Sequence, residues 1–314
     1  MVHAMSWQLE EWANDPLVHN VIVVGSGHRG LCSGGDIKKV RDILIDTSAS
    51  PHEAIGFWTA EYALDALTAT YPKPYIPIMD GVTMGGGAGI SAHGALRIAT
   101  HTTAFAMPET IIGFFPDVGL MHELGAMPGE LGMYLALTGA TINGGDAVRL
   151  NVADHLIPHD LLDQALTHAG EADLEALRAL CRIDDTPASP SVREHLAWID
   201  ACFVGDDVTA MISALRHRPE PEAGAAADAL TARSPWALTV TAHALRRAQR
   251  AEDLQAVLRQ DAYLARHFME HPDFVEGVRA RLVDKGSQPQ WLHATPADVP
   301  DAELMNLFAG GPLP

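Results

Sequence analysis

A glycine-dense turn in the first third of the chain constrains the fold more than any other feature. Residues 80–90 read DGVTMGGGAGI and directly follow a short apolar run, Tyr75 to Met79. Glycines between a strand and a helix let backbone N–H groups approach a ligand closely, where a side chain would obstruct them. A strand, a glycine-rich turn and a helix in succession are typical of α/β folds with repeated ββα units.

The first half of the chain mixes strand and helix patterns. Runs rich in β-branched and apolar residues predict four short strands, at 20–24, 75–79, 96–99 and 103–107. Pro77 weakens the second of these, because proline cannot donate to a strand ladder. Helices are predicted at the amphipathic N-terminus and over 50–71, where Trp58 and Tyr62 share one apolar stripe.

The pattern becomes helical after Pro158. Ser234-Pro235 predicts a helix start, since serine caps free amides and proline fits the first helical position. That helix runs to about residue 250, and 251–269 predict another, while PEPEAGAAA (219–227) is predicted to be a loop or hinge. We therefore expect an α/β core over 1–158 and a helical region over 159–314.

A second glycine loop, Cys32 to Asp36 (CSGGD), precedes a predicted helix capped by Asp36. Two such loops in one α/β domain are what an oxyanion hole of two backbone donors requires. Cys32 could act as a nucleophile, but the sequence places no base beside it, so a small packed residue is the preferred interpretation.

The segment Gly25 to Gly30 (GSGHRG) matches a dinucleotide-binding fingerprint, with Asp46 near the position of a ribose-binding acid. That fold needs a helix beginning within the motif. Gly34 and Gly35 would then lie inside the helix, at a cost of about 1 kcal/mol each relative to alanine. We therefore interpret the motif as a loop.

Charge and composition exclude several classes of protein. The chain carries 21 Lys and Arg against 40 Asp and Glu, a formal net charge of −19, which argues against nucleic-acid binding. One basic cluster, comprising His28, Arg29, Lys38, Lys39 and Arg41, either binds phosphate or is a solvated stretch.

The three cysteines show no CxxC spacing, so neither disulfides nor a zinc site is indicated. Without a signal-peptide pattern or a membrane-spanning apolar run, the prediction is a cytoplasmic protein with no membrane partner.

Two acids lie among apolar residues in MPETIIGFFPDVG (107–119), namely Glu109 and Asp117. Desolvation there would raise the pKa of a carboxyl group and suit it to acid–base catalysis. The structural alternative makes Glu109 a helix cap and Asp117 a turn residue. His267 and His271 have the spacing of a metal pair, but no third ligand accompanies them, so packed or surface histidines are preferred.

These segments together resemble the crotonase superfamily of enoyl-CoA hydratases and isomerases, and within it the 3-hydroxyisobutyryl-CoA hydrolases. The matching segments are LCSGGDI (31–37), KPYIPIMDGVTMGGGAGI (73–90), FAMPETIIGFFPDVG (105–119), Glu61-Tyr62 and HPDFVEGVRARLVDKGSQPQW (271–291). The resemblance covers roughly residues 5 to 295 and implies an α/β fold: a crotonase-type spiral of ββα units with a helical C-terminal portion. The N-terminal hairpin usual in such proteins is expected to be missing.

The resemblance also implies an activity and a set of site residues. The expected reaction hydrolyses 3-hydroxyisobutyryl-CoA, or a similar short 3-hydroxyacyl-CoA, to the free acid and CoA, as in valine catabolism. By family position the amides of Gly35 and Gly86 form the oxyanion hole, and Glu61, Gly86, Glu109 and Asp117 line the substrate site. Glu109 and Asp117 are the expected catalytic residues. Coenzyme A is part of the substrate, so the acyl-CoA is the expected partner and no cofactor or metal is expected; a homo-oligomer is compatible with the resemblance.

One departure from the family pattern bears on the alternatives. Enoyl-CoA hydratases use two glutamates, and the first of them follows the glycine turn, where this chain has Gly89. A hydratase or isomerase with atypical acids is the second enzyme hypothesis. A CoA-ester-binding protein without catalysis is the hypothesis from another class.

Overall fold

The computed structural model describes residues 1–46, 51–180 and 190–312. The chain forms two compact units whose segments interleave along the sequence. The first unit comprises residues 1–34, 60–106 and 141–193, and the second comprises 35–59, 107–140 and 194–314.

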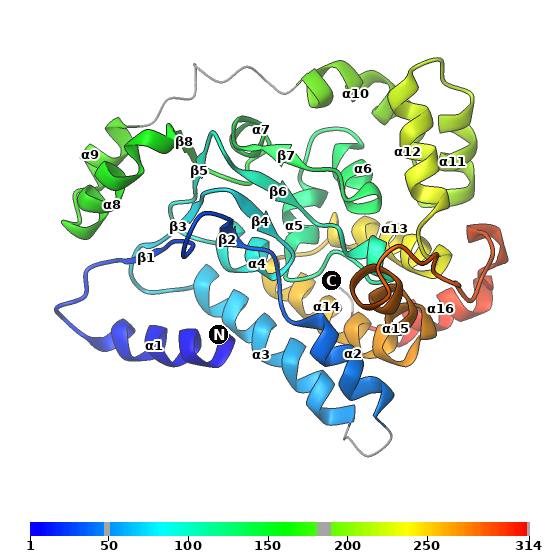
Figure 1. Cartoon of the computed structure of the whole chain (residues 1–314), viewed down its shortest axis with the longest axis horizontal. Coiled ribbons are helices and arrows are strands. Elements are labelled where there is room, and N and C mark those ends of the chain that lie inside the picture. The colour runs from blue at the N-terminus through cyan, green and yellow to red at the C-terminus, as the bar shows by residue number, and fades with distance from the viewer. Residues whose placement is uncertain (47–50, 181–189, 313–314) are drawn as a thin grey trace. The chain divides into compact units, whose positions relative to one another are not determined.

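The strands of the described residues all belong to the first unit, where they form two four-stranded sheets (Figure 1). The strands are β1 (Val21–Val23), β2 (Gly30–Cys32), β3 (Tyr75–Met79), β4 (Val82–Met84), β5 (Ile98–Thr100), β6 (Ala104–Ala106), β7 (Ile142–Asn143) and β8 (His155–Ile157). One sheet has the order β1-β3-β5-β8 and is parallel throughout. The other has the order β2-β4-β6-β7, in which only β7 runs antiparallel to its neighbour. The chain thus alternates between the sheets from β1 to β6, which confirms the predicted α/β fold of repeated ββα units.

Buried apolar side chains explain why the first sheet forms where the sequence predicts it. All five residues of β3 are buried, and Val21 of β1 stands opposite Tyr75. Ile76, Ile78 and Ile98 lie in one core cluster without solvent exposure. A strand buried on both faces reads as a continuous apolar run, as these strands do.

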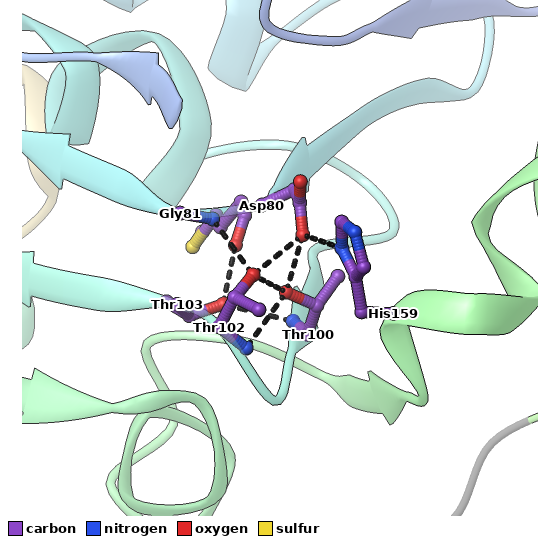
Figure 2. Close-up of polar contacts among 7 residues, drawn as sticks. Asp80, Gly81, Thr100, Thr102, Thr103 and His159 are labelled. Atoms are coloured by element: carbon purple, nitrogen blue, oxygen red, sulfur yellow. Dashed lines mark hydrogen bonds and ion pairs between the residues drawn. The ribbon is translucent and has the colours of Figure 1, made fainter. Parts of the chain in front are cut away.

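Asp80 ties together the turns that follow β3 and β5 (Figure 2). Its Oδ1 accepts hydrogen bonds from the hydroxyls of Thr100 and Thr102, each at 2.7 Å, and lies 2.8 Å from Nδ1 of His159. Burial is the largest influence on this carboxyl group and opposes its ionisation. The three hydrogen bonds and the charge of His159 together outweigh burial, so the pKa of Asp80 lies below its ordinary value.

Helices complete the first unit. They are α1 (Val2–Asn14), α4 (Gly86–Ala92), α7 (Gly144–Arg149), η2 (His159–Leu161), α8 (Leu162–Gly170) and α9 (Leu174–Ala179), with the second part of α3 (Pro51–Ala69). The N-terminal amphipathic helix and the helix predicted over 50–71 are confirmed; Ser50 lies outside the described residues.

The described part of the second unit contains helices and loops only. Besides the start of α3 these are α2 (Ile37–Ile45), η1 (Glu109–Ile112), α5 (Leu120–Gly125), α6 (Leu131–Thr138), α10 (Pro190–Cys202, which begins in the first unit), α11 (Val208–Arg216), α12 (Pro221–Thr231), α13 (Pro235–Ala248), α14 (Leu254–Glu270), α15 (Pro272–Val278), η4 (Arg279–Val283), η5 (Pro296–Asp298) and α16 (Asp301–Gly310). Its core contains packed aromatic rings: Trp58 stacks on Phe114, which contacts Phe115, Phe268 and Phe274 at tilted or edge-on angles. Among the described residues, no helix is long and apolar enough to cross a lipid bilayer.

The prediction of a loop over 219–227 is wrong. Residues from Pro221 onward form α12, with Glu220 as the residue before the helix and Pro221 in its first turn. Proline at a helix start costs no hydrogen bond, and the alanines that follow favour the helix. The helix start at Ser234 is confirmed, because Ser234 Oγ accepts the amide of Ala237 at 3.0 Å.

Candidate active site

The two glycine loops meet in the first unit. Gly86 is the first residue of α4, so its amide has no acceptor within the helix. A Cβ placed on Gly34 would lie 3.6 Å from the Gly86 nitrogen, and one placed on Gly86 would lie 3.8 Å from the Gly34 Cα. The structure therefore brings together two loops that are about fifty residues apart in sequence. Gly35, for which the family resemblance implies a place in the oxyanion hole, follows Gly34 as the first residue of the second unit.

Glu61 lies directly against Gly86. It projects from α3, its side chain is buried, and its Oε1 would be only 2.2 Å from a Cβ on Gly86. Any side chain at position 86 would therefore displace the Glu61 carboxylate. Two residues that the family resemblance implies for one site are thus neighbours in the first unit.

The environment of Cys32 fits a packed residue. Its Sγ accepts the Gly34 amide at 3.4 Å, and its Cβ would lie 2.9 Å from a Cβ on Gly87. The dinucleotide alternative is excluded at the same place, since residues from Gly30 to Cys32 form strand β2 and no helix begins within the glycine motif.

Glu109 begins η1 in the second unit, and 8% of its surface is exposed. Neighbouring hydrogen bonds fix this segment: the Phe114 amide donates to the Glu109 carbonyl at 3.1 Å, and the Thr110 hydroxyl donates to the Leu137 carbonyl at 3.0 Å. These contacts hold the backbone from which the buried Glu109 side chain projects. The expected elevation of its pKa stays a prediction.

Asp117 is also buried, at 5% exposure, and opens a tight turn in the second unit. Its carbonyl accepts the Leu120 amide at 3.0 Å, and the two residues between them, Val118 and Gly119, have φ of +53° and +78°. Asp117 thus occupies a turn, as the structural alternative predicts, whereas Glu109 is the first residue within η1 and the cap position is Pro108.

Asp261 is a buried acid of the same unit that the sequence analysis missed. Its Oδ2 accepts the Gly119 amide at 2.8 Å, and it is fully buried on α14. Burial and then the negative charge of Asp117 raise the pKa of Asp261 well above its ordinary value. A signal was present: at helical spacing Asp261 falls in the apolar stripe that includes Val257 and Ala265.

The paired histidines bond to backbone atoms. Nδ1 of His267 lies 3.0 Å from the carbonyl of Tyr263, one turn earlier, and Nδ1 of His271 accepts the Asp273 amide at the start of α15. The described residues contain no group of three metal-ligating side chains able to hold an ion. These contacts favour the packed-histidine interpretation.

Comparison with known proteins assigns the chain to a family. The family described as enoyl-CoA hydratase/isomerase matches residues 1–308. The mitochondrial 3-hydroxyisobutyryl-CoA hydrolase of Rattus norvegicus is 35% identical over 322 residues, covering 98% of this chain and 81% of the relative. The 3-hydroxyisobutyryl-CoA hydrolase 1 of Arabidopsis thaliana is 37% identical, covering 94% of this chain and 80% of the relative.

A solved structure extends the likeness to the whole fold. The crystal structure of a carnitinyl-CoA dehydratase from Mycobacterium thermoresistibile superposes with a TM-score of 0.91 at 43% identity, covering 98% of this chain and 88% of that one. The chain therefore belongs to the enoyl-CoA hydratase/isomerase family, that is, to the crotonase superfamily of enzymes. The predicted crotonase-type fold and the resemblance to 3-hydroxyisobutyryl-CoA hydrolases are confirmed.

Proposed function

We propose that the protein is an acyl-CoA thioester hydrolase that acts on 3-hydroxyisobutyryl-CoA or a similar short 3-hydroxyacyl-CoA. Relatives of that name match nearly the whole chain at 35–37% identity. The structural observation that carries the proposal is the contact of the Glu61 carboxylate with Gly86, beside a second glycine loop. The Glu61 carboxylate thus lies beside an amide that no acceptor within α4 engages, where this proposal puts the thioester carbonyl.

The substrate carbonyl is polarised by two backbone amides in this proposal. The amides of Gly35 and Gly86 donate to the thioester oxygen and stabilise the negative charge that develops on it. Donors of this kind are worth about 3 kcal/mol each toward the transition state. The amide of Gly86 suits this role because no acceptor within α4 engages it. Coenzyme A enters as part of the substrate, so the reaction needs no further cofactor.

Glu109 drives the hydrolysis by one of two routes. As a general base it takes a proton from water while the water oxygen bonds to the acyl carbon. The tetrahedral intermediate then expels the CoA thiolate, which gains a proton. As a nucleophile its carboxylate bonds to the acyl carbon and expels the thiolate, and water then cleaves the mixed anhydride. The burial of Glu109 supports both routes, since a desolvated carboxylate is more basic and more nucleophilic.

Asp117 and Glu61 have supporting roles. Asp117 binds the substrate hydroxyl or assists the leaving group, and Glu61 orients water or substrate at Gly86. Both side chains are buried, at 5% and 7% exposure, so a substrate group that they bind is also shielded from solvent.

A hydratase or dehydratase is the second candidate function, because a carnitinyl-CoA dehydratase shares the fold at 43% identity. The residue that speaks against it is Gly89, which is buried in α4 and carries no carboxylate where hydratases have their first glutamate.

A panel of substrates decides between these functions. Thiol release should be fast with 3-hydroxyisobutyryl-CoA, slower with isobutyryl-CoA, and faster than hydration with crotonyl-CoA. Hydration of crotonyl-CoA as fast as the best thiol release would favour the hydratase. Binding of all three esters with neither reaction would show a non-catalytic CoA-ester-binding protein.

A further inference from the structure

The turn that carries Asp117 has an unfavourable backbone. Val118 has φ of +53°, a left-handed conformation in which a β-branched side chain is crowded, and it is fully buried. Gly119 continues the left-handed path at φ of +78°. Such a conformation persists only where the surrounding structure holds it. The contacts that hold this turn therefore also decide where the Asp117 carboxylate lies.

Asp261 supplies a side-chain contact to this turn. Its Oδ2 accepts the Gly119 amide at 2.8 Å from α14, which is 142 residues away in sequence. The side chain has no solvent exposure, and within the described part of the chain its Oδ1 makes no hydrogen bond. An ionised carboxylate with a single hydrogen bond would be poorly compensated at such a place.

The protonation state of Asp261 follows from these surroundings. Burial is the larger cause and the Asp117 charge the second, and both raise the pKa of Asp261; the Gly119 amide lowers it by less. A neutral acid still accepts the Gly119 amide, and it places no second negative charge beside Asp117. A charged Asp261 would oppose the ionisation of Asp117.

We propose that Asp261 is a positioning residue, a neutral carboxylic acid that holds the left-handed turn at Val118 and Gly119 and thereby fixes Asp117 for the reaction. This inference rests on the proposed function only through the role of Asp117. It extends the site from the segment 107–119 to helix α14.

The first test compares two substitutions of one residue. Asp261→Asn keeps an oxygen for the Gly119 amide and is neutral, so kcat should stay within about threefold of the wild type. Asp261→Leu keeps the branched skeleton but replaces both oxygens by larger methyl groups, so it removes the acceptor. Its kcat should fall about 10²-fold with little change in KM, as expected for a misplaced catalytic group. Asp253→Ala is the matched control. Asp253 caps α14, because its Oδ1 accepts the Ala256 amide at 2.8 Å, so the substitution removes a carboxylate from the same helix and leaves the turn at Gly119 untouched. Its kcat should stay normal.

Two further measurements do not depend on activity. Infrared difference spectra of wild type against Asp261→Asn should show the C=O band of a protonated carboxyl group at neutral pH. Hydrogen exchange should be faster at the Gly119 amide in Asp261→Leu and near normal in Asp261→Asn. If the Asp261→Leu variant does not fold, the infrared spectrum and the kcat of Asp261→Asn still test the proposed role of Asp261.

The outcomes separate this inference from the proposed function. An Asp261→Asn enzyme as impaired as Asp261→Leu, a missing carboxyl band, or normal kcat in a folded Asp261→Leu would each overturn the positioning role. A wild type that hydrolyses none of the esters would refute the proposed function, while the infrared and exchange results would still test how Asp261 holds the turn.

Discussion

Replacing Gly86 by alanine tests the candidate site by a displacement that the structure defines. The new Cβ would lie 2.2 Å from Oε1 of Glu61, whereas unbonded carbon and oxygen atoms approach to about 3.3 Å at the closest. The carboxylate must therefore move by about 1 Å. The fold should tolerate this, because the displaced atom is the far end of a flexible side chain and Gly86 does not have positive φ. The free energy of unfolding should be unchanged or higher by up to about 1 kcal/mol, since alanine favours a helix over glycine.

The effect on catalysis should be much larger than the effect on stability. A misplacement of about 1 Å in a reacting site costs about 10²-fold in rate, which corresponds to about 2.7 kcal/mol in the activation barrier. We expect kcat for thiol release from 3-hydroxyisobutyryl-CoA to fall by that factor. Thermal unfolding followed by circular dichroism should give a normal midpoint for the same variant.

Two other glycines provide matched controls. A Cβ on Gly224 in α12 meets nothing within 4 Å, so Gly224→Ala should keep normal kcat and gain about 1 kcal/mol in stability. A Cβ on Gly25 would also approach an atom to 2.2 Å, but that atom is the backbone oxygen of Gly30. Gly25→Ala should therefore lose stability. Gly86→Ala and Gly25→Ala thus create the same 2.2 Å approach, but only Gly25→Ala should lose stability, because there the backbone must move instead of a flexible side chain.

A double-mutant cycle tests whether displacement of the Glu61 carboxylate causes the loss of kcat in Gly86→Ala. In an enzyme that already carries Glu61→Ala, the alanine at position 86 has no carboxylate to displace and should add little further loss. The reasoning is refuted if Gly86→Ala has normal kcat, or if it costs the same in the Glu61→Ala background as in the wild type.

Three further predictions follow from other residues. Glu109→Gln keeps the shape of the side chain and removes its charge, so kcat should fall at least about 10²-fold with little change in KM, and a near-normal kcat would remove Glu109 from the chemistry. Asp117→Ala should lessen the preference for 3-hydroxyisobutyryl-CoA over isobutyryl-CoA, measured as a ratio of kcat/KM; equal preference before and after the change would contradict its role toward the hydroxyl. The pKa of Asp80 is lower in the folded protein than its unfolded value of about 3.9, so the stability it contributes is present above that value and is lost as pH falls through the folded pKa. The free energy of unfolding, measured with urea from neutral to acid pH, should therefore fall less steeply for Asp80→Asn than for the wild type. The same pH dependence in both proteins would contradict this linkage.

The sequence pattern correctly predicted those helices and strands whose own side chains are enough to determine the secondary structure. The run Tyr75 to Met79 is apolar enough to be a buried strand whatever surrounds it, and it is one. Strands β2 and β4 were not predicted, since glycine-rich stretches have little strand preference of their own. Their backbones pair through partners distant in sequence, such as Gly30 opposite Val82. Pairing of this kind cannot be read from a local pattern.

The candidate site likewise contains residues that could be predicted from the sequence and one, Asp261, that could not. The resemblance to the crotonase superfamily implied Gly86 and Glu61 as site residues, and the structure places the two in contact. Asp261 lies far away in sequence on a helix, where an acid ordinarily faces solvent, and only the apolar stripe around it hinted at burial. Its link to Gly119 depends on how helices pack within the second unit, which no motif records.

The alternation of strands between two sheets has a consequence for how the chain folds as it is synthesised. Partners such as Val21 and Tyr75, or Ile98 and His155, are separated by long intervening stretches. Closing these loops costs entropy before any strand contact can offset it, so contact order is high and folding should be slow. The first sheet also lacks its last strand, β8, until residue 157 has left the ribosome. Until then the edge of β5 is unpaired, and a nascent chain held at that length presents an apolar strand edge on which chaperones or other nascent chains can bind.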